Sequence, residues 1–339
     1  MSFRTSFLFI VMFVLLVGTF LADILIGSIS IPFQKVIETM LHSNENDVFT
    51  DIIWQFRIPK SLTASIVGAS LAVSGLFMQT LFKNPLAGPY VLGISSGASL
   101  GVAVLIMASG ASWIPVFMLT SGWGQIIAAI AGAFFILFLV LLFSTRVNDT
   151  ISLLIIGMMF GSITGALVNV LQSITNPDAL KVFVIWSMGS LSAVTWDYMH
   201  IMLPLLGSGL LIALLLPKQL NALLLGENYA RSVGVSVFKL RFIIIFVTCL
   251  LAGAATAFTG PIAFIGIAVP HIVRGIFKTS DHKIILPASI LGGAILLLIC
   301  DIASQMPGSD YTLPVNSVSA IIGAPIIIWI IFKNKNLYS

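Results

Sequence analysis

The sequence predicts an all-α integral membrane protein of about ten transmembrane helices, and three observations support this fold class. The 339 residues are 58% hydrophobic and only 8% charged, whereas a water-soluble domain carries about 25% charged residues. Apolar runs of about 20 residues, long enough to cross about 30 Å of hydrocarbon, recur along the chain. The mean hydropathy of +1.11 agrees with these runs. We therefore expect a single transmembrane domain over residues 1–339.

The apolar runs define ten candidate spans. They cover residues 7–29, 58–82, 94–118, 123–144, 151–174, 198–217, 238–258, 261–277, 284–305 and 314–332. The first run lacks a small-x-small cleavage site and is followed by further spans, so we expect a retained helix rather than a signal peptide. The eighth run is short, and Pro270 is expected to break it.

The distribution of basic residues predicts the orientation. An even number of spans places both termini on one side, and basic residues concentrate on the cytoplasmic side. With cytoplasmic termini, the inner segments hold 12 of the 16 Lys and Arg residues, and the outer segments hold only Lys35, Arg57, Lys60 and Lys181. The net charge of +4 follows from this rule and indicates no nucleic-acid partner.

Two polar breaks are longer than a turn. The outer break, residues 30–57, is acidic at residues 44–47, which suits a solvated loop. The inner break, residues 218–237, mixes leucines with Glu227, Arg231 and two glycines. This mixture predicts a short amphipathic helix, then a turn, with room for a second helix.

Several catalytic motifs are missing from the sequence. It has no GxxxxGK[ST] phosphate loop, no HExxH and no GxSxG, and its four histidines are dispersed. Cys249 and Cys300 lie inside apolar runs, which indicates neither a disulfide nor a cysteine metal site. We therefore expect neither an enzyme nor a chain that binds ATP, a metal or another cofactor itself.

Eight separated motifs extend over nearly the whole chain. They are NPLAGPYVLGISSGASLG (84–101), WSMGSLS (186–192), LNALLLGENYARSVGV (220–235), GPIAFIGIAVPHIVR (260–274), Asp281-His282, Asp301, Leu313-Pro314-Val315 and Gly323-Ala324-Pro325. In this order they resemble the motifs of the FecCD family of permeases, the type II importer subunits that serve ferric siderophores, haem and cobalamin.

The resemblance implies a ten-helix permease subunit of an ATP-driven importer in the bacterial cytoplasmic membrane. Such a subunit works in lipid as a homodimer, or as a paired heterodimer. An ATPase dimer that binds ATP and Mg lies below it, and an extracytoplasmic substrate-binding protein docks above it. The alternative is a secondary transporter driven by an ion gradient, which Asp301 and the expected break at Pro270 would support.

The segment 218–237 is the strongest candidate site. The resemblance implies that it couples to the ATPase through residues within 220–235, namely Leu220, Leu224, Gly226, Glu227, Arg231 and Gly234. The glycines would permit the turns that present it. A simpler interpretation is a surface helix on which Glu227 and Arg231 pair at i and i+4, and the two interpretations are compatible.

Two basic residues flank Pro59 at the outer start of the second span. Arg57 and Lys60 could anchor the helix by extending their charges to the membrane interface. The resemblance implies instead that they dock carboxylates of the binding protein, where charge pairing would favour orientation and association rate.

The fifth span carries a row of small and polar residues. Gly157, Gly161 and Gly165 recur every four residues, and Asn169 and Gln172 continue the row. The spacing suits a close helix contact, but it also suits a cavity wall. The resemblance implies that Gly161, Gly165, Asn169 and Gln172 line the translocation pathway.

Asp301 is the remaining candidate, because an acid inside a span needs a partner or water. It is either a hydrogen-bond anchor or an ion site. The anchor is favoured, because no second acid lies at helical spacing beside it.

Overall fold

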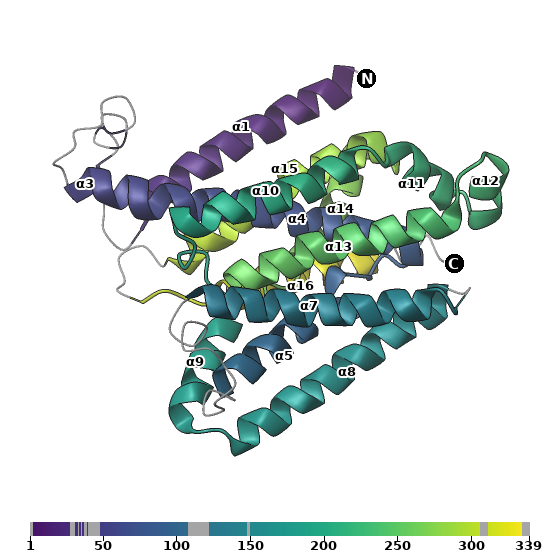
Figure 1. Ribbon diagram of the computed structural model, residues 1–339. Coiled ribbons are helices and arrows are strands. Elements are labelled where there is room, and N and C mark those ends of the chain that lie inside the picture. The colour runs from purple at the N-terminus through teal and green to yellow at the C-terminus, as the bar shows by residue number, and fades with distance from the viewer. Residues whose placement is uncertain are drawn as a thin grey trace.

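The computed structural model describes residues 3–27, 31–32, 34, 36, 39, 48–107, 122–147, 150–305 and 311–333. Within these residues all regular secondary structure is helical, and most of the long helices run alongside one another (Figure 1). Ten helices correspond to the ten predicted spans: α1 (Phe3–Leu25), α4 (Ile58–Phe82), α5 (Ile94–Met107), α7 (Gly122–Ser144), α8 (Thr150–Ile174), α10 (Trp196–Leu214), α13 (Val237–Thr259), α14 (Ile265–Phe277), α15 (His282–Ser304) and α16 (Val315–Lys333).

Length and composition confirm a multi-pass membrane protein. Seven helical segments are long and apolar enough to cross a membrane, and three shorter apolar helices, in α5, α14 and α16, account for the remaining predicted spans. Some expectations fall outside the described residues. These are residues 28–29 and 108–118 of two predicted spans, the acidic residues 44–47, and Lys35.

The sequence prediction starts the second span at residue 58, which is too late, because helical structure begins at Val48. Helix α3 (Val48–Asp51) and the π-helix η1 (Ile52–Arg57) continue directly into α4, so the last ten residues of the expected loop are helical. Pro59 has no N–H to donate. The N–H of Ile58, just before it, bonds five residues back to Ile53 O, which gives the wider π pattern.

Two further expectations differ from the structure. Pro270 does not break its helix, because α14 runs continuously from Ile265 to Phe277. Helix α9 (Pro177–Ser187) lies in a segment where only a loop was expected. Its 11 residues are too few to span a membrane, so a search for spans missed it. Asn176 begins it, accepting a hydrogen bond from Ala179 N at 2.8 Å.

Helix α4 forms the centre of the bundle, and nearly all of its residues are buried. It packs against α13, α14 and α15. Glycines allow this: a Cβ on Gly68 would lie 2.2 Å from Gly293 O of α15, and one on Gly75 would lie 1.7 Å from Gly266 O of α14. Close approach through small residues is typical of membrane helices.

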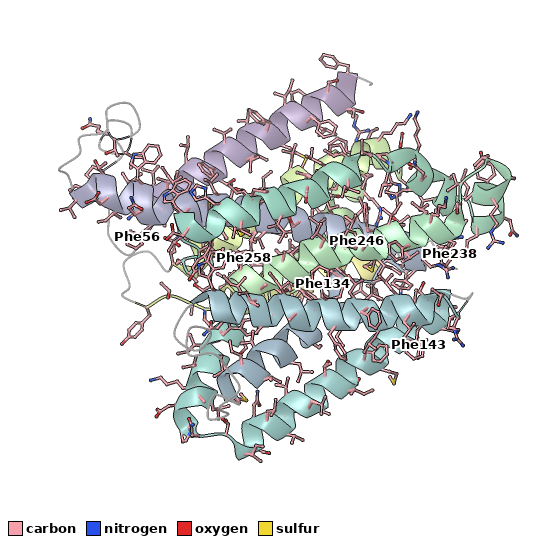
Figure 2. All side chains as sticks on the ribbon, viewed as in Figure 1. Phe56, Phe134, Phe143, Phe238, Phe246 and Phe258 are labelled. Atoms are coloured by element: carbon pink, nitrogen blue, oxygen red, sulfur yellow. The ribbon has the colours of Figure 1, made fainter. Side chains whose placement is uncertain are left out.

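The bundle has two distinct ends. Helices α11 (Pro217–Leu224) and α12 (Glu227–Ser232) lie at the same end as the start of α1, and α3 and α9 lie at the opposite end (Figure 1). The predicted pattern of a short helix, a turn and a second helix over 218–237 is confirmed. Between the ends, the surface is apolar. Figure 2 shows Phe56 and Phe238 toward opposite ends with Phe134 between them, and all three are exposed.

Candidate functional site

The leucines of the coupling segment divide between the interior and the surface. Leu220 and Leu223 of α11 are buried in the core of the chain, whereas Leu224 and Leu225 are exposed. The predicted contact of Leu220 with the ATPase is therefore wrong, because its side chain is 0% exposed. Leu224 remains a candidate contact.

A partly buried hydrogen-bond network fixes α11 to the centre of the bundle. Asn221 Nδ2 donates to Asp281 Oδ1 at 2.6 Å, and His282 N donates to Asn221 Oδ1 at 2.9 Å. The His282 ring bridges two helices, because Nδ1 lies 2.9 Å from Asn221 Oδ1 and Nε2 lies 2.8 Å from Thr80 Oγ1 of α4. Helix α11 is thus tied to both α15 and α4.

Asp281 also begins α15, with its side chain accepting from Lys283 N at 2.9 Å. Partial burial raises the pKa of Asp281, but the hydrogen bonds from Lys283 N and Asn221 and the nearby charges of Lys283 and His282 outweigh it. The pKa therefore lies below the ordinary value.

Two ion pairs of Glu227 stabilise the position of helix α12. Glu227 pairs with Arg231 at 3.6 Å in the predicted i, i+4 arrangement. Its other carboxylate oxygen lies 3.2 Å from Nη2 of Arg241, which the sequence analysis did not single out. Gly226 and Gly234 have φ of 122° and 84°. Both glycines therefore permit the turns that bound α12, as predicted.

An exposed apolar ridge runs along the coupling segment. Leu225, at the end of α11, is 69% exposed, and Tyr229 of α12 and Val233 at its end, four residues apart, are 48% and 53% exposed. Gly226 interrupts the helix between Leu225 and Tyr229. We call these three side chains the α12 ridge. The segment is too polar and too short to be a membrane span, so hydrocarbon does not explain this apolar surface.

The glycine row of α8 divides into a packed half and an open half. A Cβ on Gly157 would lie 2.9 Å from Leu92 Cα, and one on Gly161 would lie 3.5 Å from Gly93 Cα. A Cβ on Gly165 would meet nothing within 4 Å. Close packing therefore explains Gly157, Gly161 lies at ordinary van der Waals distance from Gly93, and Gly165 faces open space.

The open half of α8 presents a polar stripe. Ser162, Ala166, Asn169 and Ser173 are exposed, and Gln172 is half-buried. The two serine hydroxyls donate to carbonyls of their own helix, to Met158 O and Val170 O. Within the described part of the chain, no hydrogen bond to the Asn169 side chain is found. An amide in an apolar helix needs water or a second subunit, which fits the cavity-wall interpretation of this half.

A cluster of buried charges lies at the end of the bundle that carries α3 and α9, opposite to α11 and α12. Lys60 Nζ is 2.8 Å from Asp301 Oδ2 and 3.8 Å from Asp23 Oδ1. Gln305 Nε2 donates to the same two oxygens, at 3.0 and 3.1 Å, and Ser61 Oγ donates to Asp23 Oδ2 at 2.5 Å. We call these five residues the buried charge cluster, and it joins α1, α4 and α15.

Asp301 is thus a packing anchor, as favoured from the sequence, and no second acid lies at helical spacing beside it on α15. A second buried acid, Asp23, nevertheless reaches the same cluster from α1. Asp23 was missed, although a single acid inside an otherwise apolar run was the available signal.

Arg57 belongs to the same end. Its Nη1 donates to Ile24 O at 2.5 Å and Leu25 O at 2.9 Å, which satisfies carbonyls at the end of α1. Arg57 and Lys60 are both buried. The interfacial-anchor and docking interpretations of these two residues are therefore wrong, because both need exposed charges.

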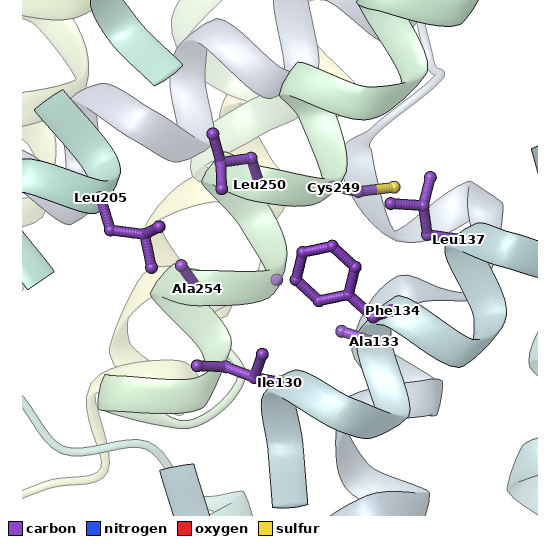
Figure 3. Close-up of a pocket in the computed structure, with 9 residues that line it drawn as sticks. Ile130, Ala133, Phe134, Leu137, Leu205, Cys249, Leu250 and Ala254 are labelled. Carbon is purple, nitrogen blue, oxygen red and sulfur yellow. The ribbon is translucent and has the colours of Figure 1, made fainter. Parts of the chain in front are cut away.

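Two hollows differ in character. The larger, about 380 Å³, lies among α7, α9, α10 and α13, with Trp186, Tyr198 and Gln125 in its lining. The smaller lies between α7, α10 and α13, where Phe134, Leu205 and Leu250 converge (Figure 3). Its lining is apolar apart from the buried thiol of Cys249.

Comparisons with known proteins cover nearly the whole chain. The sequence model of the FecCD transport family matches residues 14–333. The vitamin B12 import system permease protein BtuC of Klebsiella pneumoniae subsp. pneumoniae is 37% identical over 284 residues, which are 84% of this chain and 83% of that protein. The BtuC protein of Salmonella typhi is 36% identical over 283 residues, 83% of this chain and 84% of that protein.

Solved structures give the same picture. A chain described as a metal-chelate type ABC transporter in an inward-facing conformation superposes with a TM-score of 0.84 and 31% identity, covering 97% of this chain and 99% of that chain. A chain of PsaBC from Streptococcus pneumoniae, in complex with Fab, superposes with a TM-score of 0.53 at 16% identity, covering 88% of this chain and 95% of that one. This second likeness concerns the fold alone.

Proposed function

We propose a cargo, a set of partners and an orientation on the premise that this chain belongs to the FecCD transport family and is the permease subunit of an ABC importer. The proposed cargo is a ferric siderophore, with haem and vitamin B12 as the related alternatives. The chain carries it into the cytoplasm and makes or breaks no bond in it.

The choice among these cargoes rests on similarity. The relatives from Klebsiella and Salmonella are named as vitamin B12 permeases, and the solved neighbour is described as a metal-chelate type transporter. Vitamin B12 and ferric siderophores are both bulky metal complexes. The similarity supports this shared class. The proposal of a ferric siderophore within the class follows the motifs of the sequence rather than the names of these relatives.

The proposed energy source is a separate ATPase dimer that binds ATP and Mg. The exposed α12 ridge is the observation that carries this proposal, because apolar side chains outside the membrane are stabilised by a partner surface. Leu224, Gly226, Glu227, Arg231 and Gly234 lie on or beside this ridge. The ridge then faces the cytoplasm, together with both chain termini.

The proposed assembly contains two copies of this chain. The polar stripe on α8, with Gly165, Asn169 and Gln172, would face the same stripe of the second copy and line a wet pathway. Gly161 supports this wall from behind through its packing on Gly93. Exposed phenylalanines on other faces contact lipid.

The proposed binding protein docks at the end that carries α3 and α9. Arg57 and Lys60 serve the fold there, so the docking surface consists of other residues, for which the exposed Lys181 of α9 is a candidate. Release of cargo from the docked protein, followed by nucleotide-driven movement of α11 and α12, gives alternating access.

The alternative, a transporter driven by an ion gradient, has lost its two supports. Asp301 is paired with Lys60 in the buried charge cluster, and Pro270 lies in a continuous helix. Family membership also opposes it.

Uptake by proteoliposomes tests the proposal. The permease is reconstituted with its ATPase and binding protein, and supplied with an iron-radiolabelled hydroxamate siderophore, haem or labelled cyanocobalamin. We expect siderophore uptake that requires ATP and survives collapse of the proton gradient. Uptake of cyanocobalamin without uptake of the siderophore would mean that the cargo is vitamin B12. Uptake that needs the proton gradient instead of ATP would overturn the assignment as an ABC importer.

A further inference from the structure

Arg241 joins two segments that the sequence separates widely. This side chain, near the start of α13, is 6% exposed. Its Nη2 lies 3.2 Å from Oε1 of Glu227, the first residue of α12. Its Nη1 donates at 3.2 Å to the carbonyl of Val147, which lies after α7 and three residues before α8 begins.

The chemistry of this link makes it stiff. A guanidinium is planar and presents its donors in a fixed fork. A buried cation is also costly to separate from its partners. The guanidinium therefore holds the Glu227 carboxylate and the Val147 carbonyl at a nearly constant separation, and neither moves without the other.

The two halves of the coupling segment are attached differently. Helix α11 is tied through Asn221 to α15 and α4 at the centre of the bundle. Helix α12 has only Ala230 buried, and it is separated from α11 by Gly226 in a left-handed conformation. A load on the α12 ridge can therefore turn α12 against a fixed α11, and Arg241 receives that movement.

Helix α8 is arranged to amplify such a movement. Its first residues follow Val147, its middle is packed on Leu92 and Gly93 through Gly157 and Gly161, and its remainder beyond Gly165 faces open space. A displacement at the start of α8 would tilt the open half about the packed contact. That open half carries Asn169.

We propose that Arg241 is a positioning residue that transmits movement of α12 to the pathway helix α8. This inference rests on the proposed function, because it assumes that an ATPase moves α12. It adds a residue outside the predicted coupling segment and gives that residue a mechanical task, which is to bridge Glu227 and the Val147 carbonyl.

The experiment reads the position of α8 without needing a cargo. In a background with Cys249→Ala and Cys300→Ala, the substitution Asn169→Cys places one thiol on the polar stripe. In the complex with its ATPase, the labelling rate of this thiol is measured without nucleotide and with ATP plus vanadate. With Arg241 present, we expect nucleotide to change the rate about fivefold or more, the usual lower range for coupling between sites.

Arg241→Gln should abolish this difference while the ATPase still copurifies and hydrolyses ATP. The matched control is Lys239→Gln, which removes an exposed cation two residues away and should keep the full difference. If Arg241→Gln keeps the full difference as well, the inference is overturned. If nucleotide has no effect on the labelling rate with Arg241 present, the result contradicts the proposed function rather than the role of Arg241.

A charge swap separates transmission from simple stabilisation. The pair Glu227→Arg with Arg241→Glu restores an ion pair between the two positions, but a carboxylate cannot donate to the Val147 carbonyl. We expect the swap to leave the nucleotide effect absent, and restoration of the effect would show that only the ion pair matters. If Arg241→Gln does not fold, Glu227→Gln serves instead, and a full nucleotide effect in that variant would contradict the link.

Discussion

The two ends of the helix bundle treat charge and apolar surface in opposite ways. At the end with α3 and α9, Asp23, Lys60 and Asp301 are buried and paired with one another. At the end with α11 and α12, Leu225 and Tyr229 are exposed where no hydrocarbon covers them. One end encloses its charges, and the other exposes its apolar side chains.

This difference shows which end is complete in the single chain. The buried charge cluster pairs its side chains with one another, so its residues have little left to offer a partner. The apolar side chains of the α12 ridge are exposed, so burial within the single chain does not stabilise them. Substitutions at the first end should therefore change the stability of the permease, and substitutions at the second should change its assembly.

The largest loss of stability is expected from Lys60→Met. Removing the ammonium group leaves the carboxylates of Asp23 and Asp301 buried side by side, and an uncompensated buried charge costs about 3–5 kcal/mol. Thermal unfolding of the purified protein in detergent would measure the loss. Combining Lys60→Met with Asp301→Asn should recover part of it. A Lys60→Met protein as stable as the parent would show that the cluster is not what joins α1 to the bundle.

A smaller loss is expected from Asn221→Ala at the other end. The substitution leaves Asp281 Oδ1 without its side-chain donor and the His282 N–H without its acceptor. We expect this loss to lower the free energy of unfolding by about 1–3 kcal/mol. Hydrogen exchange should show faster opening of α11, with α12 little changed. Equal acceleration in both helices would mean that α11 is not anchored separately.

A still smaller, pH-dependent effect is expected at Asp281. Its pKa in the folded protein lies below the unfolded value of about 3.9, so its contribution to stability is complete above that pH. The contribution disappears as pH falls through the lowered folded pKa. Asp281→Asn should flatten the dependence of the unfolding temperature on pH below about 4. An unchanged acid dependence would contradict the hydrogen-bonded state of this carboxylate.

The membrane fold could be predicted from the sequence because hydrophobic run length is a strong signal. All ten predicted spans correspond to helices, and seven helical segments are long enough to cross a membrane, whereas α5, α14 and α16 contribute shorter apolar helices. The predicted boundaries are wrong where a feature other than hydrophobic run length determines the extent of the helix. Helix η1 extends the second span because Ile53 is buried, and α9 exists because Asn176 begins it outside any span.

The roles of individual polar residues could be predicted only in part. The pairing of Glu227 with Arg231 follows from helical spacing, and the glycine turns follow from φ preferences. By contrast, the partner of Lys60 on α15, Asp301, and the carbonyl that accepts from Arg241, Val147 O, both lie far away in the sequence. No spacing rule connects them, so charge positions alone placed Lys60 on the surface.

The smallest effect on permease stability, within about 0.5 kcal/mol, is expected from Leu225→Glu, because the side chain is 69% exposed. Its effect on assembly should be the largest, since a carboxylate on the α12 ridge would be buried without a partner against the ATPase. The control Ser236→Asp adds the same charge at the exposed start of α13, where aspartate is a favourable first residue.

Copurification of the ATPase with these two variants tests the central claim most directly. We predict that Leu225→Glu inserts and unfolds like the parent but retains no ATPase, while Ser236→Asp retains it fully. An undiminished yield of ATPase with Leu225→Glu would contradict the assignment of the α12 ridge as the surface through which ATP hydrolysis drives this permease.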